Sequence, residues 1–407
     1  MTNEITTKLE TFGNKHGEPH WFVQRRLDAL AKIAKAPVTS IPNYPFEKNK
    51  IAVDQAPEKI KLTKELLAMA SVDESEIGLT QIGQSSLENT LDEDDEDEGV
   101  ILTDIFTAFR QHPQLIQKYF ASKVVDESTS QDTAANTAFL NNGIFLYLPK
   151  NYQLNDSVIL NIIQDNVNQQ PLYSHVFIYA DEGSSVNTTL DIRSIGDVKN
   201  HGNVVVEVLA RPNSIVDISV LSEISTEEHV VLNTGAQISR DAQVNWNIAE
   251  VNQGPTDANF HTTLGHKTAK TQLQVLTWQH EDYPVAINSQ INAKVEQPTD
   301  IVEQFGFCEN SEKFFMSSLI NYGKDKPTGE QSLTHNHDAF MKHTKIISKR
   351  SHSTSLQLNP DMIYSLVVSS LIGFNRTDLL RQYSKSLIRR HGAISKSKLV
   401  IKKSSLE

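Results

Sequence analysis

Residues 204–221 read VVVEVLARPNSIVDISVL, and this stretch decides the fold. Apolar and β-branched residues fill both halves, and in the second half they alternate with Asp217 and Ser219. Such alternation places successive side chains on opposite faces of a strand, and the Arg-Pro-Asn between the halves is typical of a turn. The stretch therefore predicts two short strands joined by a tight connection.

Similar runs recur over much of the chain from about residue 134. Their starts lie roughly 10 to 17 residues apart, with no helical pattern between them. This spacing argues against a βαβ fold and favours an all-β core. The predicted strands cover residues 144–148, 158–163, 176–179, 186–192, 204–209, 215–221, 230–232, 244–248, 273–278, 285–291 and 301–307.

A sandwich and a solenoid of stacked strands, a β-helix, both fit this pattern. Two properties favour the solenoid. The segment of nearly 200 residues is longer than an ordinary sandwich requires, and Asn142-Gly143 is its one clear hairpin dipeptide. We therefore predict a mainly β protein with a β-helix core.

Helical patterns flank this core. The first follows Pro19, the second runs from Pro57 to about Met69, and two short ones are separated by Pro113. Near the other end, Asn359 and Pro360 form a helix start, and a second helix begins near Thr377. The predicted organisation is an N-terminal helical region over 1–133, the β-helix core over 134–350 and a C-terminal helical domain with a basic tail over 351–407.

Charge is distributed unevenly along the chain. The 407 residues carry a formal net charge of −12, which argues against a general nucleic-acid binder. Residues 342–407 hold 13 Lys and Arg against 3 Asp and Glu, so this part is at +10 and residues 1–341 are at −22. Residues 92–98 are seven adjacent acids, which repel one another and predict a solvated loop.

Thiols are nearly absent, because Cys308 is the only cysteine. A disulfide framework, a four-cysteine zinc site and a cluster bound by this chain's own thiolates are thereby excluded. The chain has no apolar run of 18 residues, so we expect no membrane span, and the polar start over residues 1–17 predicts no signal peptide. A cytoplasmic protein is the expectation.

No catalytic motif is present. The chain has no P-loop, no Gly-x-Ser-x-Gly and no His-Glu-x-x-His, so we expect no enzyme activity, and any ATP hydrolysis belongs to a partner. His335 and His337 would share one face of a strand, and His343 could approach across a turn. Imidazoles suit Fe, Zn, Cu or Ni, but surface histidines fit the pattern equally, so the metal stays unknown.

A carbohydrate-active or carbohydrate-binding β-helix protein is the alternative from another class. Catalytic acids in a β-helix come from adjacent coils with no fixed spacing, so the sequence offers candidates without a motif. The acids are Asp217, Glu223, Asp241 and Glu250, and Trp278 and Tyr283 are aromatic residues that could stack on a sugar.

Three phrases resemble one family. They are GEPHW over 17–21 followed by QRRLDAL over 24–30, GVILTD over 99–104 followed by HPQL over 112–115, and AFLNNGIFLYLPK over 138–150. Together they are similar to the SufB/SufD family of iron–sulfur cluster assembly proteins. The helical N-terminal segment and the lack of scaffold cysteines favour its SufD branch.

This resemblance implies a right-handed parallel β-helix core between helical N-terminal and C-terminal segments. It implies a non-enzymatic subunit of a SUF scaffold complex that pairs with a SufB-like subunit and docks a SufC-like ABC ATPase through its C-terminal domain. No cofactor is then bound by this chain alone, and an iron–sulfur cluster is present transiently with the partner. A homodimer is expected in isolation, since an open β-helix edge can pair with its own copy.

The resemblance also implies site residues near the C-terminal end. The phrase SHSTSLQLN over 351–359 is the best match to a family segment that holds an interface histidine, which points to His352. Tyr364 falls where the family has a tyrosine on its first C-terminal helix. Together with Leu366 and Leu379 on the two predicted helices, it is expected to contribute to docking of the ATPase.

Overall fold

The computed structural model describes residues 2–37, 62–70, 77–87, 89–168, 171–196, 200–225, 228–279, 282–293, 301–307, 313–322, 328–332 and 341–347. The chain divides into two compact units, Met1–Ser355 and Leu356–Glu407, and every described residue belongs to the first. The expected C-terminal helices lie outside the described residues, as do Cys308, His335 and His337.

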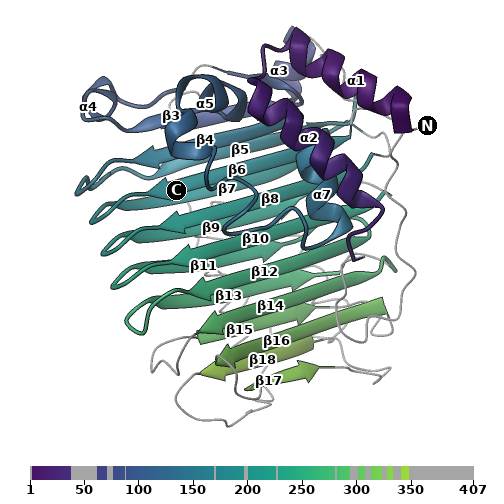
Figure 1. Cartoon of the computed structure of the whole chain (residues 1–407). Coiled ribbons are helices and arrows are strands. Elements are labelled where there is room, and N and C mark those ends of the chain that lie inside the picture. Colours follow the sequence, from purple (N-terminus) through teal and green to yellow (C-terminus); the bar gives the residue numbers. More distant parts are fainter. Residues whose placement is uncertain are drawn as a thin grey trace, which may run out of the picture. The chain divides into compact units, whose positions relative to one another are not determined.

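From residue 142 to residue 322, successive strands alternate between two sheets, each with nine strands among the described residues (Figure 1). Sheet A contains β1 (Gly78–Ile82), β2 (Ser85–Ser86), β5 (Val158–Asp165), β7 (Ser185–Ile195), β9 (Ile215–Glu223), β11 (Gln243–Glu250), β13 (Lys270–Trp278), β15 (Ile301–Phe307) and β18 (Met341–Ile347). Sheet B contains β3 (Ile101–Asp104), β4 (Asn142–Leu148), β6 (Leu172–Ala180), β8 (Gly202–Ala210), β10 (Val230–Ile238), β12 (Thr256–Leu264), β14 (Val285–Ala293), β16 (Phe314–Tyr322) and β17 (Thr328–Ser332).

Within each sheet the strands stack in parallel and in register. In sheet B, for example, Val176 pairs with Val206, and in sheet A Val216 pairs with Val244. Antiparallel pairs occur only where the described stack begins and ends, at β1·β2, β3·β4, β15·β18 and β16·β17. This topology is a β-solenoid, and it confirms the expected β-helix.

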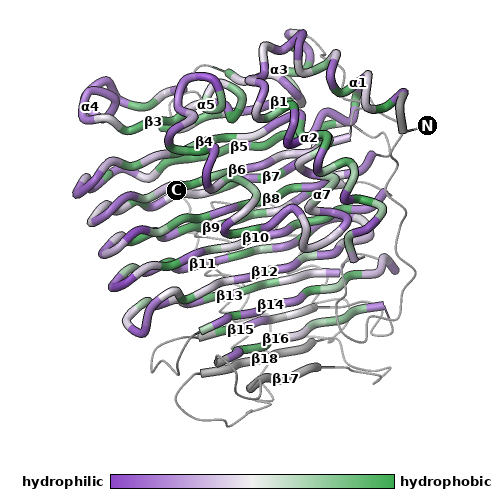
Figure 2. The backbone as a smooth tube through the Cα atoms, in the orientation of Figure 1, coloured by the Kyte–Doolittle hydropathy of each residue, from purple (hydrophilic) through white to green (hydrophobic). Residues whose placement is uncertain are grey.

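The core lies between the two sheets. Each strand turns alternate residues inward, so that Val204, Val206 and Val208 of β8 join one continuous apolar cluster with their equivalents in the neighbouring coils. Each such side chain contributes about 1.5–3 kcal/mol when it leaves water. Figure 2 shows the complementary pattern, with hydrophilic residues gathered at the turns along one edge.

Turns at that edge repeat the same backbone device. Asn151, Gly183, Asn213 and Asp241 each adopt a positive φ, between 58° and 72°, one per coil. Consecutive turns are hydrogen-bonded to each other, since the Gly183 amide donates to the Pro212 carbonyl and the Asn213 amide to the Arg240 carbonyl. Glycine, asparagine and aspartate tolerate this left-handed conformation best, which explains the residue types at these corners.

A helical layer covers part of the solenoid (Figure 1). Aromatic and aliphatic residues of the layer meet the outward side chains Phe145, Phe177 and Leu209 of sheet B. On the outer face of sheet A, Leu66 of α3 (Lys64–Ala70) packs with Ile163 and Ile195. The other helices of the layer are α1 (Thr2–Lys15), α2 (His20–Ile33), α5 (Ile105–Gln111), α6 (Pro113–Ile116) and α7 (Gln131–Phe139).

Most predicted elements within the described residues are confirmed. Some elements of the structure were not predicted, and three of them show why. The strand β12 (TDANFHTTL) was not predicted because two of its inward positions, Thr256 and Thr262, are polar and weaken the apolar alternation. The helix α1 was not predicted because its sequence is mostly polar. The helix α7 was not predicted because its alanines give little amphipathic signal; Ser130 caps it through a reciprocal capping box with Thr133.

Two local predictions differ from the structure. Residues 92–98 are solvated as expected, but five of them form the short helix α4 (Glu93–Asp97), since acids are favoured in a first helical turn. Asn142-Gly143 is not a hairpin turn but the start of β4. Glycine is needed there because a Cβ atom would lie 2.4 Å from the His175 carbonyl oxygen.

Gly143 therefore provides a test of the stacking. We expect Gly143→Ala to destabilise the protein by about 1–3 kcal/mol, because the methyl group meets backbone that cannot move aside. Urea unfolding followed by circular dichroism measures the change. Gly202→Ala is the control, since its Cβ would meet only side-chain atoms of Gln164 and Ile224 at 3.1 Å. Equal losses for both variants would contradict the close approach.

Candidate functional site

The residues expected to carry function, His352, Tyr364, Leu366 and Leu379, lie outside the described residues. Of the three candidate metal-binding histidines, His343 falls on the backbone of β18, and the other two lie outside the description. Within the described parts of the chain, no group of three or more His, Cys, Asp or Glu could hold a metal ion.

The carbohydrate candidates do not converge. Asp217 is exposed on β9, and Asp241 is exposed in a turn. Glu250 ends β11 on the inward register of that strand and is fully buried. Trp278 is buried at the end of β13. Glu250 and Trp278 are therefore closed to solvent, so neither could line a groove that binds a sugar.

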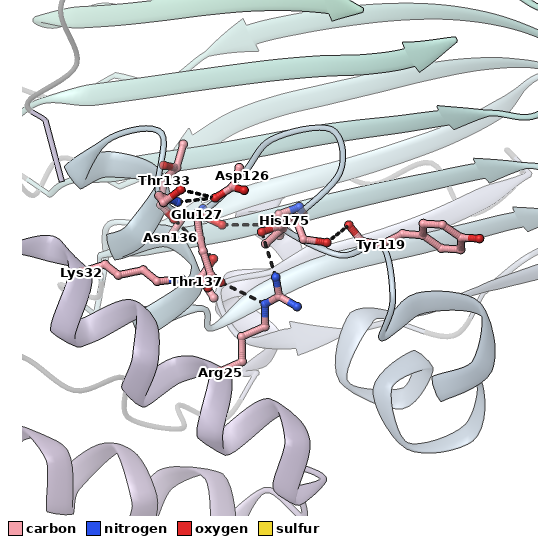
Figure 3. Close-up of polar contacts among 12 residues, drawn as sticks. Arg25, Lys32, Tyr119, Asp126, Glu127, Thr133, Asn136, Thr137 and His175 are labelled. Carbon is pink, nitrogen blue, oxygen red and sulfur yellow. Dashed lines mark hydrogen bonds and ion pairs between the residues drawn. The ribbon is translucent and has the colours of Figure 1, made fainter. Parts of the chain in front are cut away.

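A cluster of polar side chains lies where the helical layer meets sheet B (Figure 3). His175 of β6 and Glu207 of β8 project from the outer face of the sheet, which is covered here by the segment that follows α6. The two side chains are 1% and 0% exposed, and His175 Nε2 lies 2.9 Å from Glu207 Oε2. The pair is closed to solvent.

Asn136 of α7 orients His175 within this pair. Its Nδ2 group donates to the carbonyl oxygens of Ser174 and Asn203, at 2.9 and 3.1 Å, so its Oδ1 atom faces His175 Nδ1, at 3.0 Å. Because Oδ1 only accepts, the His175 Nδ1–H group donates to it. The other ring nitrogen, Nε2, is thereby directed at Glu207.

Glu207 also fixes a loop. Its two carboxylate oxygens accept hydrogen bonds from the backbone amides of Ala121, at 2.9 Å, and Val125, at 2.8 Å. Ala121 adopts a positive φ of 47°, which is unusual for alanine. The carboxylate therefore offsets its own burial by satisfying amides and stabilises a strained segment of the layer.

Ion pairs of α2 reinforce the same segment. Glu127 accepts hydrogen bonds from Arg25 Nε, at 3.0 Å, and from Lys32 Nζ, at 2.6 Å (Figure 3). Arg25 Nη2 also donates to the Ala121 carbonyl at 3.0 Å. Loop 121–127 is thus bound to β8 on one side and to α2 on the other.

A second buried pair attaches α2 to the end of α7. Arg26 is fully buried and makes a bidentate contact with Glu18, at 2.6 and 2.8 Å. Its remaining hydrogens reach the carbonyl oxygens of Ala138, at 3.0 Å, and Leu140, at 2.7 Å. The guanidinium also lies 4.6 Å from the Phe22 ring centroid, which suits a planar cation.

The residues of this cluster hold α2, loop 121–127 and α7 against sheet B. Their contacts do not form an arrangement typical of a catalytic site. Its carboxylates are buried and paired with basic side chains, so these pairs stabilise the docking of the helical layer. The phrases quoted from the sequence supply several of these residues, including Glu18, Arg25 and Arg26. His175 and Glu207 were missed; Glu207, a single carboxylate within a run of valines, was the available signal.

The described part of the chain is thus a β-solenoid on which a helical layer docks, in part through buried charged pairs. Residues 162–301 match the SufBD core domain of the SUF system for FeS cluster assembly, and residues 72–160 match the SufBD protein N-terminal region. The chain belongs to the SufB/SufD family and is most like SufD.

Curated relatives support this assignment. The iron-sulfur cluster assembly protein SufD of Bacillus subtilis is 32% identical over 267 residues, which cover 63% of this chain and 61% of that protein. A SufBD family protein of Staphylococcus saprophyticus is 28% identical over 203 residues, 46% of this chain and 43% of that protein. One from Staphylococcus haemolyticus is 29% identical over 186 residues, 42% and 40% of the two chains. The matched part thus spans about 40 to 61% of these relatives' lengths.

The buried pair gives a test of the cluster. We expect Glu207→Gln to destabilise the protein by about 3–5 kcal/mol, because it breaks a buried pair and leaves His175 without its carboxylate. Thermal unfolding measures the loss, and hydrogen exchange at the Ala121 and Val125 amides should increase.

The control is the exposed pair formed by Lys150 and Glu182. Glu182→Gln is expected to leave both readouts unchanged, because exposed ion pairs contribute little. If Glu207→Gln behaved in the same way, the buried pair would not hold the loop.

Proposed function

We propose that this chain is a non-enzymatic subunit of an iron–sulfur cluster assembly complex. The observation that carries the proposal is the match of both family regions to one continuous solenoid, from β1 through β14. The family is described by cluster assembly in the SUF system, which favours this function over a carbohydrate-active β-helix.

The low thiol content of this chain supports a model in which a partner subunit holds most of the cluster. Iron–sulfur clusters are normally held by several thiolates, and this chain has one cysteine. A SufB-like partner would therefore hold most of the cluster, which is cargo rather than a cofactor of this chain. The chain itself supplies shape and contacts, with His352 at the interface of the two subunits.

Energy would come from a SufC-like ABC ATPase, since this chain has no P-loop. In the proposed arrangement the ATPase docks on the C-terminal segment through Tyr364, Leu366 and Leu379. Dimerisation of the ATPase on ATP binding would then strain the pairing with the SufB-like subunit. This effect requires that contacts between the subunits differ between the two states. A homodimer is expected when both partners are missing.

The complex itself is the main test. Co-expression with SufB-like and SufC-like subunits of the same host should give a complex that survives affinity capture and size exclusion. Recovery of this chain only as a separate homodimer, under conditions where an authentic SufD assembles, would refute the proposal. No helix in the described parts of the chain is long and apolar enough to cross a membrane.

The proposed interface histidine can be tested in the same complex. We expect His352→Ala to reduce the amount of cluster formed on the complex, measured by visible absorbance after anaerobic reconstitution. His391→Ala is the matched control, because it removes a histidine of the same basic segment outside the matched phrase. Equal cluster yields for both variants would remove His352 from the site.

Docking of the ATPase is tested by deletion. Removal of residues 359–407 should abolish capture of the SufC-like subunit and preserve capture of the SufB-like subunit, because the two partners are assigned to different segments. Leu366→Asp should reproduce the first loss, since it places a charge in the proposed docking surface. Retention of the ATPase by the truncated chain would show that docking lies elsewhere.

A further inference from the structure

One position inside the solenoid departs from the apolar pattern. The inward register of sheet A runs from Ile162 to Ile192, then to Ser222, Glu250 and Thr277 in successive coils. Two coils show that isoleucine fits this position. The next coils replace it by two small polar side chains and a carboxyl group, and these three are at most 1% exposed.

Hydrogen bonding around Glu250 is incomplete among the described residues. Its Oε1 atom accepts from the Asn252 amide at 3.0 Å, whereas Oε2 has no partner. Asn252 Oδ1 accepts from the Ile224 amide, at 2.7 Å, and from the Ser222 hydroxyl, so Nδ2 is the donor end of this side chain. Within the same described set, Asn252 Nδ2 and Thr277 Oγ1 are also buried without a partner.

Three polar atoms without partners therefore belong to one group of neighbours. The Asn252 amide donates directly to Glu250. Thr277 is the in-register neighbour of Glu250 on the next strand, and adjacent strands lie about 4.8 Å apart. Ser222 and Thr277 each have a smaller side chain than the isoleucine of the earlier coils. Buried polar groups are nearly always satisfied, by protein or by ordered water.

We propose that Glu250, Asn252 and Thr277 form a hydrated site inside the solenoid, where ordered water joins Glu250 Oε2, Asn252 Nδ2 and Thr277 Oγ1. One water molecule can accept from the amide and from a protonated carboxyl group, and it can donate to the hydroxyl oxygen. These donors and acceptors therefore match a small neutral ligand that both donates and accepts hydrogen bonds, as water does. The site does not depend on any partner of the chain.

Glu250 is the titratable group of this site. Burial raises its pKa to about 8, and the hydrogen bond from the Asn252 backbone amide partly opposes the shift. Ser222 from β9, Thr277 from β13 and Asn252 from the following turn are the polar side chains that face it, and none of them titrates. The folded chain therefore keeps the proton over a range in which the unfolded chain has released it.

The sign of the pH dependence follows. Because the pKa is raised by folding, stability falls as pH rises from about 4.5, the unfolded value, to about 8, and is then constant. Over this range the unfolding equilibrium constant should rise by up to tenfold per pH unit in the wild type relative to Glu250→Gln. Urea unfolding at pH 5, 6, 7, 8 and 9 measures both proteins.

Asp217→Asn is the matched control, because it removes an exposed carboxyl group of β9. Its unfolding equilibrium constant is expected to change with pH as steeply as that of the wild type. Identical slopes for the wild type and Glu250→Gln would overturn the assignment of Glu250 as the titrating group.

Hydration has its own test, in which the two outcomes differ in sign. Thr277→Val removes one partner of the proposed water and is expected to lower stability. If the site is dry, the same change removes an unsatisfied buried hydroxyl and raises stability, which would overturn the proposal. Thr271→Val, on the same strand, is the reference variant. It gives the loss of stability expected when a buried hydroxyl with a known partner, the Val244 carbonyl, is removed. A crystal structure of the full chain should show density within hydrogen-bond distance of Glu250 Oε2.

Discussion

Parallel, in-register stacking of the coils is the constraint on which the rest of the structure depends. Each strand residue has an equivalent directly above and below it, so one column of the sequence shares one environment. A column that faces inward must be apolar or must satisfy its polar groups inside the stack. The continuous cluster between the sheets shows that most inward columns take the first solution.

The same constraint governs the outer face of sheet B. Stacking brings His175 and Glu207, 32 residues apart in sequence, to neighbouring strands, and it orients both toward the helical layer. Apolar outward residues such as Phe177 bury the layer's aromatic side chains, while Glu207 gives its segment hydrogen-bond acceptors. Hydrophobic burial therefore attaches the layer, and the charged pairs determine where it attaches.

Prediction from the sequence succeeded for elements whose own residues show a clear pattern of polar and apolar positions. Strands with strong alternation, such as 215–221, were located because inward and outward residues differ in polarity. It failed where the deciding contact is distant in sequence. Glu207 could be placed outside the solenoid core by alternation, but its partners in α7 and in loop 121–125 come from other elements. The candidate residues near the C-terminal end, His352 among them, stay predictions.

Stacking also limits where a partner could act on this chain. Most coils hydrogen-bond to a neighbour on both sides along whole strands, so a shift within the stack would break many bonds at once. The described stack ends in antiparallel strands, and the helical layer packs on the solenoid through side chains rather than through strand ladders. A change between two states requires contacts that differ between them. Such contacts are more accessible at the ends of the solenoid and in the layer than between the coils, so a partner-driven motion is expected to leave the central coils intact.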